Sequence, residues 1–315
     1  MDNFCEKMRA VMIGHAVGDA LGVPIEFSWR DDLDASPVTD MMGYGSYDVP
    51  AGAWSDDTSM TLATLDSLAK GKIDYEEIMG NFVRWCTEDT YTPTGEMFDI
   101  GQTCLDAVRC YLESGKPALE CGQAGERSNG NGSLMRIHPF LLYAHAKRLS
   151  TKVWMEIVKR GSLLTHAHDR AVLGCQIYGC VLMHLLEDPC KESVFHGLLC
   201  AEQLLGNRAE FSHYKRIFDP DFASLDRAEI KSSGYVVDTL EAALWCLLTT
   251  EDYKSCVLKA VNLGRDTDTV AAIAGGLAAA LYGYDSIPDS WQNTLIKRDY
   301  IEDMCKTACA CWTSP

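Results

Sequence analysis

Two short acidic clusters hold the residues of this sequence best suited to do chemistry. Residues 55–58 read Ser-Asp-Asp-Thr and residues 266–269 read Asp-Thr-Asp-Thr, and each cluster precedes a segment with helical apolar periodicity. Ser, Asp and Thr are preferred N-cap residues, and the helix dipole stabilises carboxylates at this end, so each cluster alone is also typical of helix capping. One capping residue suffices for one helix, however, so two multi-carboxylate clusters suggest a further role.

The chemistry of these donors favours hard cations. The segment 270–281, after the second cluster, is apolar on all sides, which predicts that the helix and its start are buried. Buried carboxylates without cations would be costly or would take up protons. Oxygen donors favour Mg²⁺ or Mn²⁺, whereas zinc or copper would require His or Cys, and neither cluster contains a His. We therefore expect a centre for two divalent cations, Mg²⁺ or Mn²⁺.

A glycine-rich segment offers a site for an anion. Residues 128–136 read Ser-Asn-Gly-Asn-Gly-Ser-Leu-Met-Arg, and such glycines let a ligand approach backbone amides closely. The segment lacks the Gly-Lys-Ser/Thr of a Walker loop. A plain glycine-rich entry into a helix is the alternative interpretation.

The elements that must position these residues are helices. Apolar residues recur at the helical period in segments 141–149, 153–164, 171–186, 240–248 and 270–281, whereas alternation typical of strands is almost absent. Long irregular connections are expected at 28–55, 88–98, 114–133 and 209–236, and such connections are often functional. No repeat or linker divides the chain, so the sequence predicts one all-α domain over residues 1–315.

The composition restricts the classes of partner that this protein is expected to bind. The 315 residues include 28 Lys and Arg against 45 Asp and Glu, a formal net charge of −17, which argues against nucleic acid or an anionic membrane as a partner. The longest apolar stretch, residues 270–282, is shorter than the roughly 20 residues that a bilayer span needs. The fourteen cysteines form no Cys-x-x-Cys pair, so we expect incidental or structural thiols. These features predict a soluble, cytoplasmic protein, which we expect to be a monomer.

Six motifs in a fixed order resemble the ADP-ribosylglycohydrolase family. They are residues 14–22 with Glu26, then 55–58, 98–101 (Phe-Asp-Ile-Gly), 130–136, 164–166 (Leu-Thr-His) and 264–269, and the resemblance covers residues 11–283. It implies a compact, orthogonal multi-helix domain and a metal-dependent glycosidase acting on ADP-ribose linkages.

The resemblance also implies roles for individual residues. Those implied to hold the two cations, with Asp268 bridging them, are Ser55, Asp56, Asp57, Asp266, Asp268 and Thr269. Those implied to wrap the pyrophosphate and proximal ribose are Asn129, Gly130, Asn131, Gly132, Ser133 and Met135. His166 resembles a residue near the adenosine end, although a hydrogen-bonded core histidine is the alternative.

Three acidic residues are implied to act in catalysis: Glu26, Asp99 and Asp268. Glu26 is expected to transfer a proton, with a metal ligand or a solvated carboxylate as alternatives. Asp99 resembles a residue near the acceptor in arginine-cleaving bacterial members, and a carboxylate suits a guanidinium; a helix cap is its alternative. Arg265 stands where several members have Gly, and its contacts cannot be read from the sequence.

The substrate expected from the resemblance is ADP-ribosyl-arginine in a mono-ADP-ribosylated protein. ADP-ribosyl-serine, O-acetyl-ADP-ribose or another small ADP-ribose conjugate would use the same metal centre with another acceptor pocket. A non-catalytic ADP-ribose-binding or crystallin-like protein is the alternative from another class. All six implied metal positions carry oxygen side chains, which favours an enzyme.

Overall fold

The computed structural model describes residues 3–314, and this range is helical, with 3-10 turns in the connections and no strands beyond two isolated bridges. The all-α prediction is confirmed. The α-helices are α1 (Asn3–Gly22), α2 (Arg30–Ala35), α3 (Asp56–Leu68), α4 (Tyr75–Glu88), α5 (Gln102–Ser114), α6 (His138–Ala146), α7 (Thr151–Leu163), α8 (Asp169–Glu187), α9 (Lys191–Leu205), α10 (Val236–Leu248), α11 (Tyr253–Val261), α12 (Thr267–Tyr282), α13 (Asp289–Thr294) and α14 (Arg298–Thr313).

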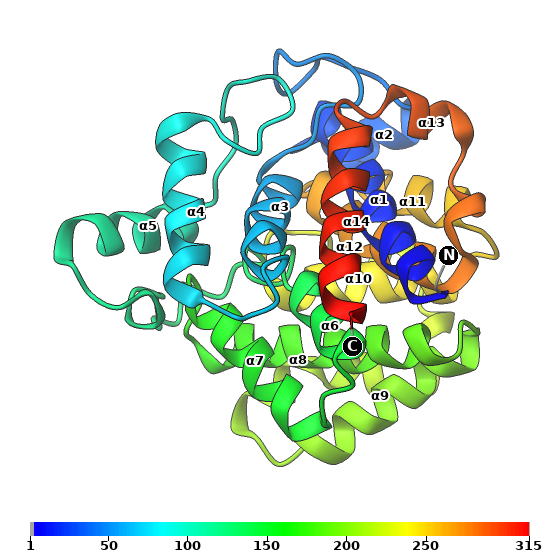
Figure 1. Cartoon of the computed structure of the whole chain (residues 1–315). Helices are drawn as coiled ribbons and strands as arrows, with labels where there is room; N and C mark the ends of the chain where they lie inside the picture. The colour runs from blue at the N-terminus through cyan, green and yellow to red at the C-terminus, as the bar shows by residue number, and fades with distance from the viewer. Residues whose placement is uncertain (1–2, 315) are drawn as a thin grey trace.

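A closely packed pair of helices, α1 and α12, forms the centre of the fold (Figure 1). Gly14 of α1 lies against Gly275 and Ala279, whereas Gly18 lies against Ala271, so the two helices run antiparallel. A Cβ atom added to Gly18 would lie 2.6 Å from the carbonyl carbon of Ala271, nearer than side chains approach. Glycine is therefore required here because the two backbones are in contact.

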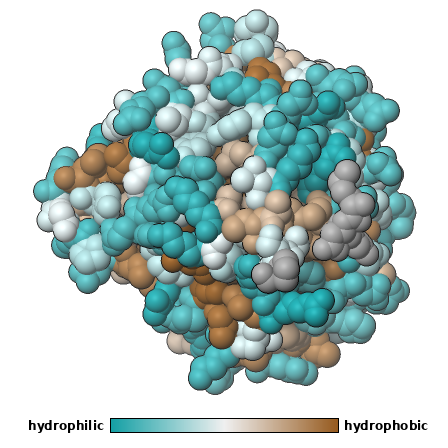
Figure 2. All heavy atoms as spheres, in the orientation of Figure 1, coloured by the Kyte–Doolittle hydropathy of each residue, from teal (hydrophilic) through white to brown (hydrophobic). Residues whose placement is uncertain are grey.

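The other helices surround this pair. In Figure 1, α4 and α5 lie to one side, α7, α8 and α9 below, and α14 in front of α1 and α12. The buried side chains of α12 are mostly small, because the helix is rich in alanine and glycine. Large side chains such as Trp54, Trp85 and Trp291 fill the surrounding core. Figure 2 shows a mostly hydrophilic face, in keeping with the acidic composition. No helix of the described range is both long and apolar enough to cross a membrane.

Two expectations about the chain need correction. The segment 28–55 is not irregular throughout, because it contains α2, and the segment 209–236 contains a 3-10 helix at Ala209–Phe218. The expectation of unpaired thiols was wrong for Cys5 and Cys309, which form a disulfide between α1 and α14 with their Cα atoms 5.8 Å apart. These residues are 304 positions apart, so local spacing carried no signal of the pairing. The other twelve cysteines are free.

Candidate active site

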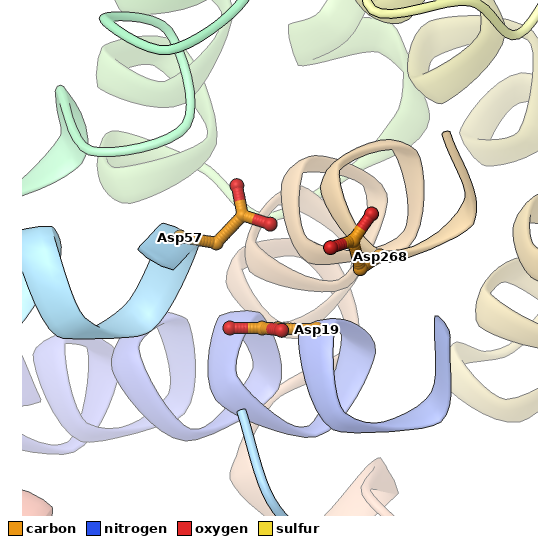
Figure 3. Close-up of side chains that lie close together, drawn as sticks. All are labelled: Asp19, Asp57 and Asp268. Atoms are coloured by element: carbon orange, nitrogen blue, oxygen red, sulfur yellow. The ribbon is translucent and has the colours of Figure 1, made fainter. Parts of the chain in front are cut away.

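Three buried aspartates from three helices face one another at the centre of the fold (Figure 3). They are Asp19 near the end of α1, Asp57 in the first turn of α3 and Asp268 in the first turn of α12. One carboxylate oxygen from each lies within 4.8 Å of the others. The antiparallel packing of α1 on α12 places Asp19 beside the start of α12, and α3 adds Asp57.

A second group shares one member with the first. Glu26, Asp266 and Asp268 also bring one oxygen each within 4.8 Å of one another. Asp268 therefore belongs to both groups, and the two predicted acidic clusters lie side by side, as the sequence led us to expect.

Asp19, which was not among the predicted site residues, fixes the start of α3. Its carboxylate accepts hydrogen bonds from the backbone of Ser55 (2.9 Å) and from the backbone and hydroxyl of Thr58 (3.0 and 2.6 Å). The sequence signal was a lone carboxylate in an otherwise apolar helical stripe, since such a group must find partners when it is buried.

The hydroxyls of both clusters converge on Asp57. Ser55 is the N-cap of α3, where its hydroxyl accepts a bond from the backbone of Asp57, so the capping interpretation is confirmed alongside any other role. The hydroxyls of Ser55 and Thr269 each lie 3.2 Å from Oδ2 of Asp57. Its other oxygen, Oδ1, is buried and lacks a hydrogen-bond partner within residues 3–314.

Asp56 and Asp266 face the adjoining cavity. Asp56 accepts a long hydrogen bond of 3.4 Å from the backbone of Gly101. Asp266 is the N-cap residue of α12, but its carboxylate makes no capping bond; it accepts a 2.6 Å bond from the side-chain amide of Asn131. Asn131 is in turn held by a bond to Thr239 (2.9 Å), so its amide group serves the carboxylate cluster.

The electrostatics fit a divalent cation. Burial, with the charges of neighbouring carboxylates, raises the pKa values of Asp56, Asp57 and Asp268 well above their usual range. Burial also raises the pKa of Asp19 to about 6. Within residues 3–314 no Lys or Arg forms an ion pair with these groups. An all-oxygen donor set with an unpartnered buried oxygen and no neutralising cation is the environment that Mg²⁺ or Mn²⁺ favours.

A cavity of about 470 Å³ opens beside the carboxylates. This volume is within the usual range for small-molecule sites. Of the residues predicted to bind substrate, five line the cavity: Gly130, Asn131, Gly132, Met135 and His166. Two others do not line it. The Asn129 amide donates to the carbonyl of Glu126, and the Ser133 hydroxyl accepts from Ser162 in the core.

The structure confirms His166 as a hydrogen-bonded core histidine and also places its ring at the cavity. Its Nδ1 lies 2.8 Å from the hydroxyl of Thr165, as a hydrogen-bonded core histidine would, yet the ring also lines the cavity. Burial, together with the charge of Arg136, lowers its pKa to about 3. The ring is therefore neutral near pH 7.

Glu26 and Asp99 line the same cavity, and Tyr47, which was not among the predicted residues, lies beside them without lining it. Glu26 is only 6% exposed, so the solvated-carboxylate alternative was wrong; burial, then the charge of Asp99, raises its pKa to about 9. Burial raises the pKa of Asp99 to about 6. The neighbouring Tyr47 hydroxyl lowers the pKa values of both carboxyl groups and so partly offsets these rises, and the Tyr47 ring packs 5.0 Å from that of Phe98.

The backbone positions these two carboxyl groups. Asp99 has a left-handed φ of 53°, and Gly101 rather than Asp99 is the N-cap residue of α5, so the capping alternative was wrong. The segment bearing Tyr47 is tied to that of Glu26, because the Ser46 hydroxyl donates a 2.6 Å bond to the carbonyl of Glu26. Tyr47 stands in a segment expected to be irregular, and the sequence offered no signal of its role.

An all-helical fold with two linked carboxylate groups beside a cavity defines a helical protein with a candidate dinuclear metal centre. The chain belongs to the ADP-ribosylglycohydrolase family, whose sequence model matches residues 1–313. It is similar, with 100% coverage of both chains, 28% identity and a TM-score of 0.83, to a solved structure described as an ADP-ribosylglycohydrolase-related protein complex. The family resemblance is thereby confirmed.

Named relatives match this chain over more than nine tenths of its length. The chain is 34% identical over 305 residues to ADP-ribosylarginine hydrolase Tri1 of Serratia proteamaculans, covering 96% of this chain and 78% of that protein. A protein of the same name from Pseudomonas putida is 34% identical, with 96% and 77% covered. ADP-ribosyl-[dinitrogen reductase] glycohydrolase of Rhodospirillum rubrum is 31% identical, with 92% and 90% covered.

Proposed function

We propose that this protein hydrolyses the glycosidic bond between ADP-ribose and arginine in mono-ADP-ribosylated proteins. The observation that carries the proposal is the pair of three-carboxylate groups that share Asp268. They lie beside a cavity that Glu26 and Asp99 line. Two relatives at 34% identity are named ADP-ribosylarginine hydrolases, which supports arginine as the acceptor.

The residues proposed to hold two divalent cations, Mg²⁺ or Mn²⁺, are Ser55, Asp56, Asp57, Asp266, Asp268 and Thr269. Asp19 lies in the same group as Asp57 and Asp268, so it is proposed either to bind a cation or to orient the carboxylates that do. Such cations, when bound, supply orientation of the ribose hydroxyls and polarisation of a water molecule. Asn131 holds the carboxylate of Asp266 in place for this role.

Glu26 is proposed to move the proton during cleavage. A pKa raised to about 9 means that this carboxyl group keeps its proton at neutral pH in the metal-free protein. Glycosidic cleavage uses one acid and one base, so a protonated carboxyl group beside the scissile bond suits donation to the leaving group. Glu26 also lies in the group with Asp266 and Asp268. The alternative is therefore that Glu26 binds a cation in the substrate-free protein.

The cavity is proposed to bind the rest of ADP-ribose through backbone and neutral groups. Gly130 and Gly132 leave room for backbone amides to contact the pyrophosphate, which lets an acidic protein hold an anion. Met135 and neutral His166 would contact the ribose and adenosine end. Asn129 and Ser133 would support the segment, because their side chains bond to the protein.

The test of the catalytic role replaces Glu26 with Gln, which keeps the size of the side chain and removes its acid function. Glu26→Gln should lower turnover by about 10²- to 10⁴-fold, the usual contribution of general acid–base catalysis. Isothermal titration with ADP-ribose should give an unchanged affinity. Near-wild-type turnover would remove Glu26 from the mechanism.

The acceptor is tested separately. Asp99→Ala should raise KM for ADP-ribosyl-arginine peptides, because the carboxylate is expected to pair with the guanidinium. Serine peptides and O-acetyl-ADP-ribose, assayed in parallel, address the alternative substrates. Binding of ADP-ribose without cleavage of any of these would favour the non-catalytic alternative. Light scattering would test the proposal that residues 1–315 act as a single-domain monomer.

A further inference from the structure

We propose that Phe27, Trp29 and Arg265 form a docking surface for the polypeptide that carries the ADP-ribosyl group. We name these three residues the acceptor rim. The inference rests on the proposed function and extends it, because it makes a modified protein rather than a small conjugate the preferred substrate.

The rim continues the cavity outward from its carboxylate side. Phe27 directly follows Glu26 and Arg265 directly precedes Asp266, and both side chains line the cavity. Trp29 lies outside the cavity lining, and the guanidinium of Arg265 stacks over its ring at 4.3 Å. A group attached to the anomeric carbon near Glu26 would therefore leave the site beside these side chains.

The rim presents large aromatic surfaces to solvent. Phe27 is 63% exposed and Trp29 is 65% exposed, the highest values among the exposed large apolar side chains of the described residues. Aromatic residues and Arg are enriched at the centres of protein interfaces, where they contribute most of the binding free energy. Their position at the edge of a substrate cavity argues for contact with the substrate's own polypeptide.

The backbone holds the rim in this exposed arrangement. Phe27 and Arg265 both have left-handed φ angles, 66° and 68°, which non-glycine residues rarely adopt. The amide of Phe27 donates to the carbonyl of Arg265 (2.6 Å), and the amide of Arg265 donates to the carbonyl of Ser28 (2.8 Å). This pair of bonds offsets the unfavourable conformation and fixes the two segments together.

Arg30, which follows Trp29, ties the segment of the acceptor rim to the rest of the fold. Arg30 donates from its guanidinium to the carbonyls of Leu263 (2.9 Å), Arg227 (2.7 Å) and Ile230 (2.7 Å). The residue after Trp29 is thus bonded to the connection that leads to Arg265. The exposure of Trp29 is a feature of a fixed segment, since that segment is bonded to three backbone carbonyls.

The chemistry of the rim specifies its occupant. Arg265 pairs with no carboxylate within residues 3–314, so its donors remain for a backbone carbonyl or an acidic side chain of the target. The aromatic faces suit the apolar parts of residues flanking a modified arginine. Trp29 lies outside the cavity lining, so a conjugate small enough to fit within the cavity would not contact it, whereas a polypeptide attached to the ADP-ribosyl group would extend past it.

The experiment compares two substrates of wild type and Trp29→Ala. One is a protein mono-ADP-ribosylated by an arginine-specific transferase, and the other is ADP-ribosyl-agmatine. Trp29→Ala should lower kcat/KM for the protein on the order of tenfold, through KM, as loss of an interface hot spot does. The value for the small conjugate should change by less than about twofold, within the usual effect of an exposed substitution. Trp29→Phe should restore most of the loss, because it keeps an aromatic face.

Two controls make the outcome decisive. Trp29 provides no side-chain cap to α2, and an exposed cation–π contact with Arg265 is worth only about 0.5–1 kcal/mol, so its replacement should lower the melting temperature only slightly. Phe195→Ala removes a comparably exposed aromatic side chain from α9, which contributes no residue to the cavity, and should affect neither substrate. Equal losses on both substrates, or no loss on either, would overturn the rim. Failure of wild type to cleave either substrate would overturn the proposed function and the rim with it.

Discussion

Replacing Gly18 with Ala should damage both the stability of the fold and the metal centre. The added Cβ would lie 2.6 Å from the carbonyl carbon of Ala271 and 3.0 Å from the Cα of Ala272, whereas ordinary contacts begin at 3.4 Å. Both neighbours are backbone atoms of α12, which cannot rotate away. The carbonyl oxygen of Ala271 would lie nearer still, so we expect α1 and α12 to separate locally by more than the 0.8 Å between 3.4 and 2.6 Å.

The magnitude follows from overpacking. Forcing an extra methyl group into a packed interior costs about 1–3 kcal/mol in the free energy of unfolding. For a chain of 315 residues that corresponds to a fall of roughly 1.5–5 °C in the melting temperature. Asp19 follows Gly18 directly and lies within the carboxylate group of Asp268, so the separation should also weaken Mn²⁺ binding. Changes around metal ligands typically cost about 10- to 100-fold in affinity.

The assay combines thermal unfolding, with and without Mn²⁺, and calorimetric titration of Mn²⁺. Gly80→Ala is the matched control, because a Cβ there meets nothing within 4 Å and the residue lies inside α4. That substitution should stabilise the protein by up to about 1 kcal/mol through helix propensity. Equal stability and equal Mn²⁺ affinity in Gly18→Ala and wild type would refute the packing explanation.

Three further predictions concern the charged site. Mg²⁺ or Mn²⁺ at 100 times its dissociation constant should stabilise the metal-free protein by about 2.7 kcal/mol, and a melting temperature unaffected by either metal or EDTA would contradict the metal centre. In the metal-free protein the pKa of Glu26 rises from 4.5 to about 9 through burial and the charge of Asp99, so the unfolded chain loses this proton first. The stabilisation from the protonated group is complete below pH 4.5 and is lost as the pH rises toward 9; urea unfolding should show this decline, and Glu26→Gln should reduce it. Tyr47→Phe removes a hydroxyl that lowers the pKa values of Glu26 and Asp99, but it keeps the ring that packs on Phe98. The pH–rate profile should therefore move to higher pH with little change in KM. An unmoved profile would show that the hydroxyl has no such effect.

The sequence predicted the parts of the site that depend on local pattern. The starts of α3 and α12 could be located because Ser and Asp precede apolar helical stripes, and the excess of carboxylates indicated that the two starts meet. The glycine-rich segment could likewise be singled out, and four of its residues, Gly130, Asn131, Gly132 and Met135, line the cavity.

Features set by distant contacts could not be predicted. Asp19 resembles a single polar residue in an apolar helix until α1 packs on α12. Tyr47 reaches Glu26 only because its irregular segment bonds back to residues 24–26. The hydrogen bond from the amide of Asn131 to Asp266 could not be predicted either, because these residues are distant in the sequence and meet only in the folded protein.

The most direct test of the central claim measures release of free ADP-ribose from ADP-ribosyl-arginine and ADP-ribosyl-serine peptides. Each reaction is run with EDTA, Mg²⁺ or Mn²⁺, beside the double variant Asp56→Asn/Asp268→Asn. The account predicts release from the arginine peptide that requires Mg²⁺ or Mn²⁺ and is lost in the variant. Release that persists in EDTA, or that survives in the variant, would contradict the metal centre; release from serine alone would contradict the assignment of Asp99 to the guanidinium.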